Sequence, residues 1–78
     1  NFIYLGENLY GGVYEGTTEQ VAETIFRAWV NSPLHNKLML DPFPSGMYIN
    51  YQITNKMIVD GVTYICCDFI YCVLTVYK

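Results

Sequence analysis

The sequence predicts an α+β fold in which helices pack against an antiparallel sheet. Residues 18–30 repeat apolar side chains at helical spacing, whereas residues after Gly46 alternate between apolar and polar. A third observation is the Asp60-Gly61 pair, a typical hairpin turn between two apolar runs. We therefore expect helices followed by antiparallel strands, within a single domain over residues 1–78.

Composition predicts that this domain needs a partner. Hydrophobic residues make up 53% of the 78 residues and charged residues only 14%, and a chain of this size buries only about 60% of its unfolded surface. We expect apolar surface to be covered by a second copy, as a homo-oligomer, or by a missing N-terminal segment. The net charge of −3, without a Lys/Arg cluster, argues against nucleic acid and anionic membranes as partners. The apolar run 62–77 is short for a membrane span.

Residues 1–16 are predicted to form a loop that contains a short extended piece. Several glycines with aromatic residues between them are typical of loops. We expect the extended piece at Phe2–Leu5. No signal peptide is evident, because the chain lacks a basic stretch followed by an apolar one.

The first helix is predicted over Thr18–Val30. Thr17 and Gln20 have the spacing of a capping box. Glu23 and Arg27 form an i,i+4 pair in the favourable order.

A second, shorter helix is predicted over Pro33–Leu40. Ser32 provides an N-cap and Pro33 suits the first helical position. The helix is expected to end before Asp41, because the two prolines that follow, Pro42 and Pro44, forbid a helical backbone. His35, the one histidine of the chain, falls in its first turn.

The second half of the chain is predicted to consist of strands. The strand from Gly46 is expected to be half exposed, with one apolar face. Val62–Tyr77 reads as one strand that is apolar on both faces, so it needs cover on both sides. Since the chain supplies one substantial helix, a second covering layer is missing. The residues expected on the apolar face of the first strand are Met47, Ile49, Tyr51 and Ile53.

The three cysteines are expected to be free and buried. On one extended strand, Cys66 and Cys72 would lie about 20 Å apart, too far for a disulfide. Cys66 and Cys67 would point to opposite faces of that strand. We interpret all three as small hydrophobic core residues, because their spacing does not match a zinc site.

Three segments resemble a known family. "GENLYGG", "EQVAETIFRAWVNSPLHNKLML" and "PSGMYINYQI" look like the bacterial branch of the CAP superfamily, the SCP domain of cysteine-rich secretory proteins, antigen 5 and pathogenesis-related proteins. The match covers most of residues 6–69, and residues 29–40 are its most specific part. The resemblance implies the C-terminal two-thirds of an α-β-α sandwich that lacks the family's N-terminal helix, and an extracellular or cell-surface location. "YICCDF" departs from the Tyr-Trp-Thr-Gln strand of the family.

The resemblance also implies a cleft lined by Glu7 and His35. A carboxylate beside an imidazole can serve general base catalysis, so these are the candidate catalytic residues. Glu7 could instead satisfy loop amides, and His35 could instead be a capping or surface group. Asn8 and Tyr64 are candidate ligand-binding residues, although Asn8 could simply fix the loop and Tyr64 could be an ordinary strand aromatic. No cofactor is evident, and two ligands are too few for a metal, so a divalent metal would need ligands from outside this chain.

Three functions remain open at this point. The first is an extracellular binding or interaction module whose cleft around Glu7 and His35 takes a lipid or other small apolar ligand. The second is a metal- or water-dependent hydrolase that uses the same cleft. The third is a non-functional remnant of such a domain. The sequence favours the first over an enzyme, because it offers no evident nucleophile and an incomplete set of metal ligands.

Overall fold

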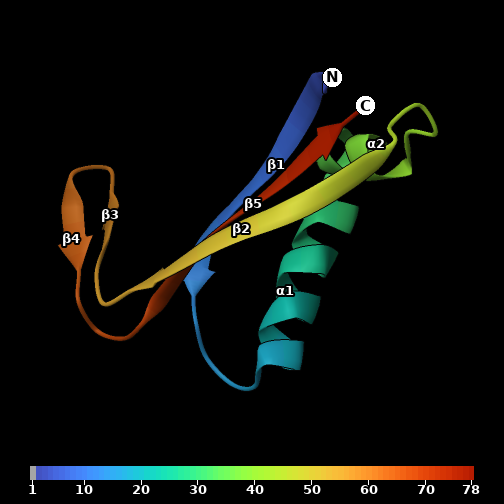
Figure 1. The fold of residues 1–78 in the computed structure, drawn as a ribbon. Helices are drawn as coiled ribbons and strands as arrows, with labels where there is room; N and C mark the ends of the chain where they lie inside the picture. Colours follow the sequence, from blue (N-terminus) through green and yellow to red (C-terminus); the bar gives the residue numbers. More distant parts are fainter. Residues whose placement is uncertain (1) are drawn as a thin grey trace.

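A computed structural model describes residues 2–78 and confirms the α+β fold, with two helices, an antiparallel three-stranded sheet and a separate hairpin (Figure 1). The elements in chain order are β1 (Tyr4–Val13), α1 (Thr18–Val30), α2 (Pro33–Leu40), β2 (Gly46–Thr54), β3 (Met57–Val59), β4 (Val62–Tyr64) and β5 (Phe69–Tyr77).

The main sheet has the order β1-β5-β2, so the strand that comes last in the chain lies in the middle. Both neighbours run antiparallel to β5. In this register Leu74 of β5 lies between Asn8 of β1 and Ile49 of β2. The two-stranded sheet β3-β4 stands at the end of the main sheet that is far from α2 (Figure 1).

The prediction of a loop over residues 1–16 is wrong for most of that segment, because Tyr4–Val13 forms the long strand β1. Glycine lowers local strand propensity, but pairing along almost the whole of β5 fixes the extended backbone. Gly6 has a packing role here. A Cβ atom at this position would lie 3.1 Å from Leu38 Cδ1, so glycine allows α2 to approach the sheet closely.

Both helices begin and end where the sequence predicted. Thr17 and Gln20 form both hydrogen bonds of the capping box on α1. Ser32 occupies the N-cap position of α2, but its hydroxyl caps no backbone amide. That hydroxyl lies 2.7 Å from His35 Nδ1 instead.

The hairpin turn at Asp60-Gly61 is confirmed, since both residues have positive φ angles of 51° and 79°. The single strand predicted over Val62–Tyr77 is wrong. Strand β4 ends at Tyr64, and β5 begins at Phe69 after a short loop. The break has a physical reason: β4 pairs only with β3, so the chain has to leave one sheet before it enters the other.

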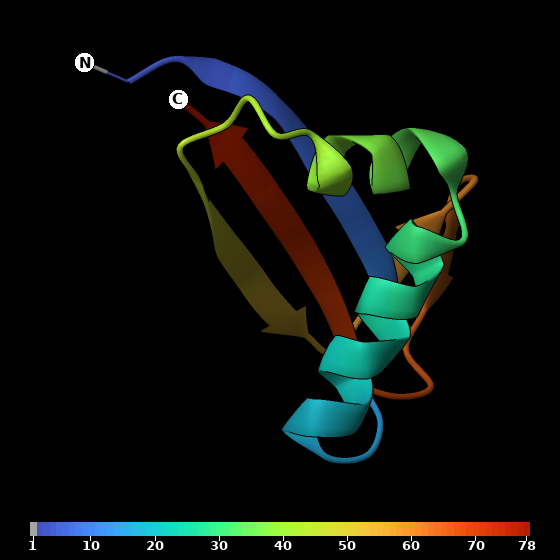
Figure 2. The same cartoon turned by 90° about the vertical axis from the view of Figure 1, so that its right-hand side faces the viewer.

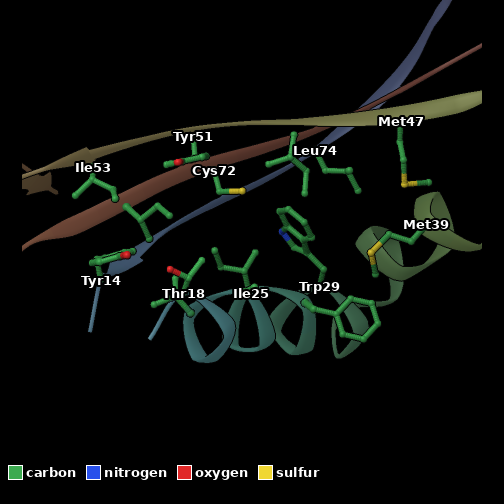
Figure 3. A pocket seen from close by; sticks show the side chains of 15 residues that line it. Tyr14, Thr18, Ile25, Trp29, Met39, Met47, Tyr51, Ile53, Cys72 and Leu74 are labelled. Carbon is green, nitrogen blue, oxygen red and sulfur yellow. The ribbon is translucent and has the colours of Figure 1, made fainter. Parts of the chain in front are cut away.

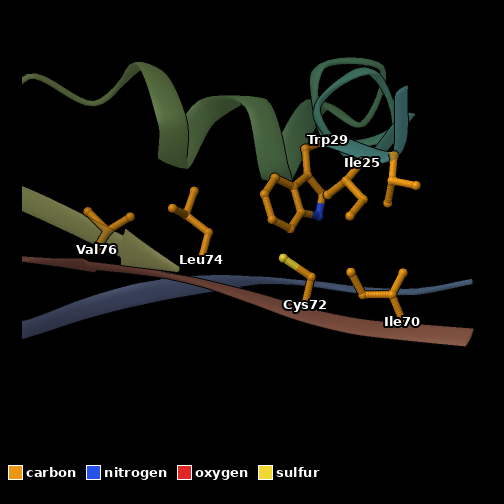
Figure 4. Packing of buried hydrophobic residues seen from close by; sticks show 7 residues of the cluster. Ile25, Trp29, Ile70, Cys72, Leu74 and Val76 are labelled. Atoms are coloured by element: carbon orange, nitrogen blue, oxygen red, sulfur yellow. The ribbon is translucent and has the colours of Figure 1, made fainter. Parts of the chain in front are cut away.

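The core lies between α1 and the facing side of β5 (Figure 4). Alternate residues of β5 point toward the helix, which confirms the predicted period of two. Both helices lie over this one face of the sheet (Figure 2). The members of the core cluster are Val21, Ile25, Trp29, Ile70, Cys72, Leu74 and Val76.

Among residues 2–78, no helix covers the opposite face of the sheet. At one end of that face the Met57 side chain of the hairpin approaches Gly11 of β1. Phe69, which alternates along β5 with the core residue Ile70, is buried, while Leu9 is exposed.

The cysteines divide into two groups. Cys72 is buried in the core, as predicted. The prediction is wrong for the other two, because Cys66 is exposed and Cys67 is half-buried in the loop between β4 and β5. None of the three forms a disulfide, but the reason given for Cys66 and Cys67, opposite faces of one strand, does not hold. Their Sγ atoms lie 3.2 Å apart.

Candidate functional site

An apolar groove lies between α1 and the facing side of β5 and β2 (Figure 3). Its volume is about 500 Å³. No charged side chain lines it, and its polar side-chain groups are hydroxyls, the thiol of Cys72 and the indole N–H of Trp29, which is hydrogen-bonded to the backbone. The lining residues are Tyr14, Thr18, Val21, Ala22, Ile25, Phe26, Trp29, Met39, Met47, Ile49, Tyr51, Ile53, Ile70, Cys72 and Leu74.

The groove exists because the helices are fastened toward β1 and not toward β2. The indole Nε1 of Trp29 donates a hydrogen bond of 3.0 Å to the backbone oxygen of Leu9 in β1. The side-chain amide of Asn8, also in β1, donates a hydrogen bond of 3.1 Å to the backbone oxygen of His35 in α2. These two bonds hold the helices over β1 and β5, and the facing side of β2 stays uncovered. Ile49 and Tyr51 are 57% and 67% exposed as a result.

The two ends of the groove differ in chemistry. Met39 and Met47 close one end, and Tyr14 and Thr18 line the other (Figure 3). Methionine side chains are flexible and polarisable, and they adapt to irregular apolar shapes. Between the ends, burial raises the pKa of the Cys72 thiol, which keeps this group uncharged at neutral pH. The groove is therefore suited to an apolar, uncharged group.

Glu7 and His35 do not share a cleft in this structure. Glu7 and Asn8 are neighbours on a regular stretch of β1, so their side chains point to opposite faces. Asn8 points toward α2, where its amide binds the backbone of His35. Glu7 is therefore directed to the face without helices. On that face the pKa of the Tyr4 phenol is raised, first by desolvation and then by the negative charge of the nearby Glu7. A catalytic role for Glu7 or His35 remains a prediction.

Asn8 and Tyr64, the two candidate ligand-binding residues, lie in different parts of the structure. Asn8 is 1% exposed and holds α2 against the sheet, which fits the alternative that it has a structural role. Tyr64 is in the hairpin strand β4, 47% exposed, at the end of the main sheet far from α2 (Figure 1). Neither side chain lines the apolar groove. Their role in ligand binding stays a prediction.

Among residues 2–78, no group of three or more His, Cys, Asp or Glu side chains is placed to hold a metal ion. The same residues contain no helix with the length and apolarity needed to cross a bilayer.

Comparison with known proteins finds no protein family, no curated protein and no solved structure that matches this chain. The resemblance to the CAP superfamily therefore remains an expectation from the quoted motifs.

The sequence predicted the β2 wall of the groove but did not predict that α1 would leave this wall uncovered. The alternation after Gly46 predicted the apolar face of β2 that lines it. What no local pattern indicated is the sideways offset of α1, which depends on the hydrogen bond from Trp29 to Leu9. A buried tryptophan that needs an acceptor for its N–H was the available signal.

Proposed function

We propose that this chain is a binding module of the CAP/SCP type that takes a small apolar ligand, such as the acyl chain of a lipid, in the groove between α1 and β2. The proposal transfers the ligand from the cleft expected around Glu7 and His35 to the groove. An extracellular or cell-surface location belongs to the same proposal and rests on the resemblance alone.

The observation that carries the proposal is the apolar groove itself. Its volume of about 500 Å³ falls within the roughly 300–1,000 Å³ of small-molecule sites. Apolar surface removed from water contributes about 25 cal/mol per Å², and the exposed side chains of Ile49 and Tyr51 offer such surface to a ligand. The absence of charge along the groove favours an alkyl or sterol-like group over an ionic one.

The hydrolase alternative has no supporting observation. It needs a carboxylate and an imidazole in one place, and Glu7 and His35 lie on different faces of the sheet. The Ser32 hydroxyl lies 2.7 Å from His35 Nδ1, but within residues 2–78 no carboxylate is hydrogen-bonded to this pair to orient the imidazole.

Tryptophan fluorescence tests the proposal directly. Trp29 is the one tryptophan of the chain and lines the groove. We expect a fatty acid that carries a bromine quencher on its acyl chain to quench Trp29 in a saturable way. An unlabelled fatty acid should then restore the fluorescence by competition.

Two isoleucine variants provide a matched control. Ile49→Asp places a charge in the groove, whereas Ile58→Asp places the same charge on the hairpin, and the two side chains are similarly exposed at 57% and 62%. We expect Ile49→Asp to weaken quenching at least about tenfold, a change equivalent to about 1.4 kcal/mol, and Ile58→Asp to leave it unchanged. Equal quenching of both variants, with both still folded by circular dichroism, would rule out the groove as the site.

A further inference from the structure

The loop between β4 and β5 brings the thiols of two adjacent cysteines, Cys66 and Cys67, close together. The Sγ atoms of Cys66 and Cys67 lie 3.2 Å apart. Neighbouring residues of a strand direct their side chains to opposite faces, so this approach is a property of the loop conformation. Cys66 is exposed and Cys67 half-buried, and neither lines the apolar groove. This pair therefore forms a second chemical site, independent of the proposed function.

The geometry allows a bond between the two sulfur atoms, but not a relaxed one. A disulfide needs the sulfurs about 2.05 Å apart, so a modest rotation of the two side chains would suffice. The Cα atoms of adjacent residues are only about 3.8 Å apart, closer than the roughly 4.4–6.8 Å of ordinary disulfides. A bond here would be strained, and strained disulfides are the ones that are readily reduced again.

We propose that Cys66 and Cys67 form a redox-active dithiol that exchanges with low-molecular-weight disulfides of the glutathione type. The thiolate of one cysteine attacks the small disulfide, which forms a mixed disulfide and releases one thiolate. The neighbouring sulfur then attacks the mixed disulfide, forms the Cys66–Cys67 bond and releases the second thiolate. The two protein thiols give up two electrons to the small disulfide, and their two protons pass to the released thiolates.

The surroundings assign an order to the two attacks. The hydrogen bond with Cys66 raises the pKa of the Cys67 thiol most, and desolvation and then the acidic neighbours Glu15 and Asp68 raise it further. Cys66 is also the more exposed sulfur. Cys66 therefore makes the first attack, and Cys67 resolves the mixed disulfide.

The test uses the full chain, oxidised glutathione, acid quenching and intact mass. We expect wild type to lose two hydrogen atoms and to accumulate no glutathione adduct. Cys66→Ser and Cys67→Ser should each be unable to form the internal bond, and Cys67→Ser should accumulate the adduct on Cys66. Cys72→Ala, which removes the buried thiol, should behave as wild type. A wild-type chain that retains the adduct, or that forms covalent dimers instead, would overturn the proposal.

A second measurement tests whether the folded loop favours the disulfide beyond what adjacency in the sequence alone provides. The equilibrium constant of the internal disulfide against glutathione is measured for the native chain and again in concentrated guanidinium. We expect the native value to be at least about tenfold larger, which corresponds to about 30 mV for a two-electron couple. Equal constants would mean that the fold does not prepare the pair, and the proposal would fail.

Discussion

Strands β5 and β2 are neighbours of equal length, yet they have opposite environments. Each has nine residues, and they pair along their whole length. Most of β5 is buried, whereas β2 is exposed at every position except its two ends. The contrast is sharpest at one directly opposed pair, because Leu74 is 4% exposed and Ile49 is 57% exposed.

The difference teaches that position, and not composition, decides burial in this sheet. Both strands present alternate apolar side chains to the face that carries α1. β5 is central and lies under the helix, whereas β2 is an edge strand beside it. An edge strand offers unpaired backbone groups to any chain that approaches it. Two predictions test this contrast directly, and two with smaller effects test how β1 holds the helices to one face of the sheet.

The largest expected effect is on assembly. If a second copy covers β2, the purified chain should self-associate with a Kd of about 1 µM or lower, equivalent to about 8 kcal/mol. Sedimentation velocity over a concentration series measures this. We expect Tyr51→Lys, on the groove face of β2, to weaken association, because a charge on an edge strand opposes pairing with another chain.

A well-folded monomer at micromolar concentration would contradict this prediction of a homo-oligomer. It would leave the covering layer to another segment or partner.

The second effect is on stability and compares the two opposed residues directly. Leu74→Ala should lower the free energy of unfolding by about 2–5 kcal/mol, as is typical of a leucine truncated in a core. Ile49→Ala should change it by only about 0.5 kcal/mol, as is typical of exposed positions. Urea denaturation of both variants at the same low protein concentration measures the difference.

Similar losses for the two variants would show that β2 is covered in solution. That outcome would remove the contrast on which the groove depends.

A smaller effect is expected at the bond that holds α2 to the sheet. Asn8→Ala removes the buried amide that binds the backbone oxygen of His35 and leaves that acceptor without its partner. We expect a loss of about 1–3 kcal/mol. The adjacent Glu7→Gln, on the exposed side of the same strand, is the control and should be nearly neutral in the same urea titration.

The smallest effect concerns the imidazole of His35. At a fixed pH, Glu7→Gln should leave the ring proton resonances of this single histidine unmoved, because the sheet separates the two side chains. Ser32→Ala should shift them, because its hydroxyl lies 2.7 Å from Nδ1. A clear shift in a folded Glu7→Gln variant would restore the cleft that the resemblance implied.

What the sequence predicted well was encoded locally. The start of α1 follows from Thr17 and Gln20, the start of α2 follows from Pro33, and the hairpin turn follows from Asp60-Gly61. These signals act within a few residues, so one sequence is enough to read them.

What the sequence missed depends on pairing between distant segments. β1 was read as a loop because its partner, β5, lies more than half the chain away. That error carried into the site. Once Tyr4–Val13 is known to be a strand, simple alternation separates Glu7 from Asn8 and therefore from His35.

The central place of β5 has a consequence for the order in which the protein can be built. A ribosome makes β1 and β2 well before β5, yet each of them pairs only with β5 in the main sheet. Until residues 69–77 have left the exit tunnel, the nascent chain holds two apolar strands without their hydrogen-bonding partner. Sheet formation therefore waits for the last strand, and an interrupted chain that lacks β5 loses both pairings at once. Such a chain would expose the kind of unpaired apolar strands that chaperones and proteases engage.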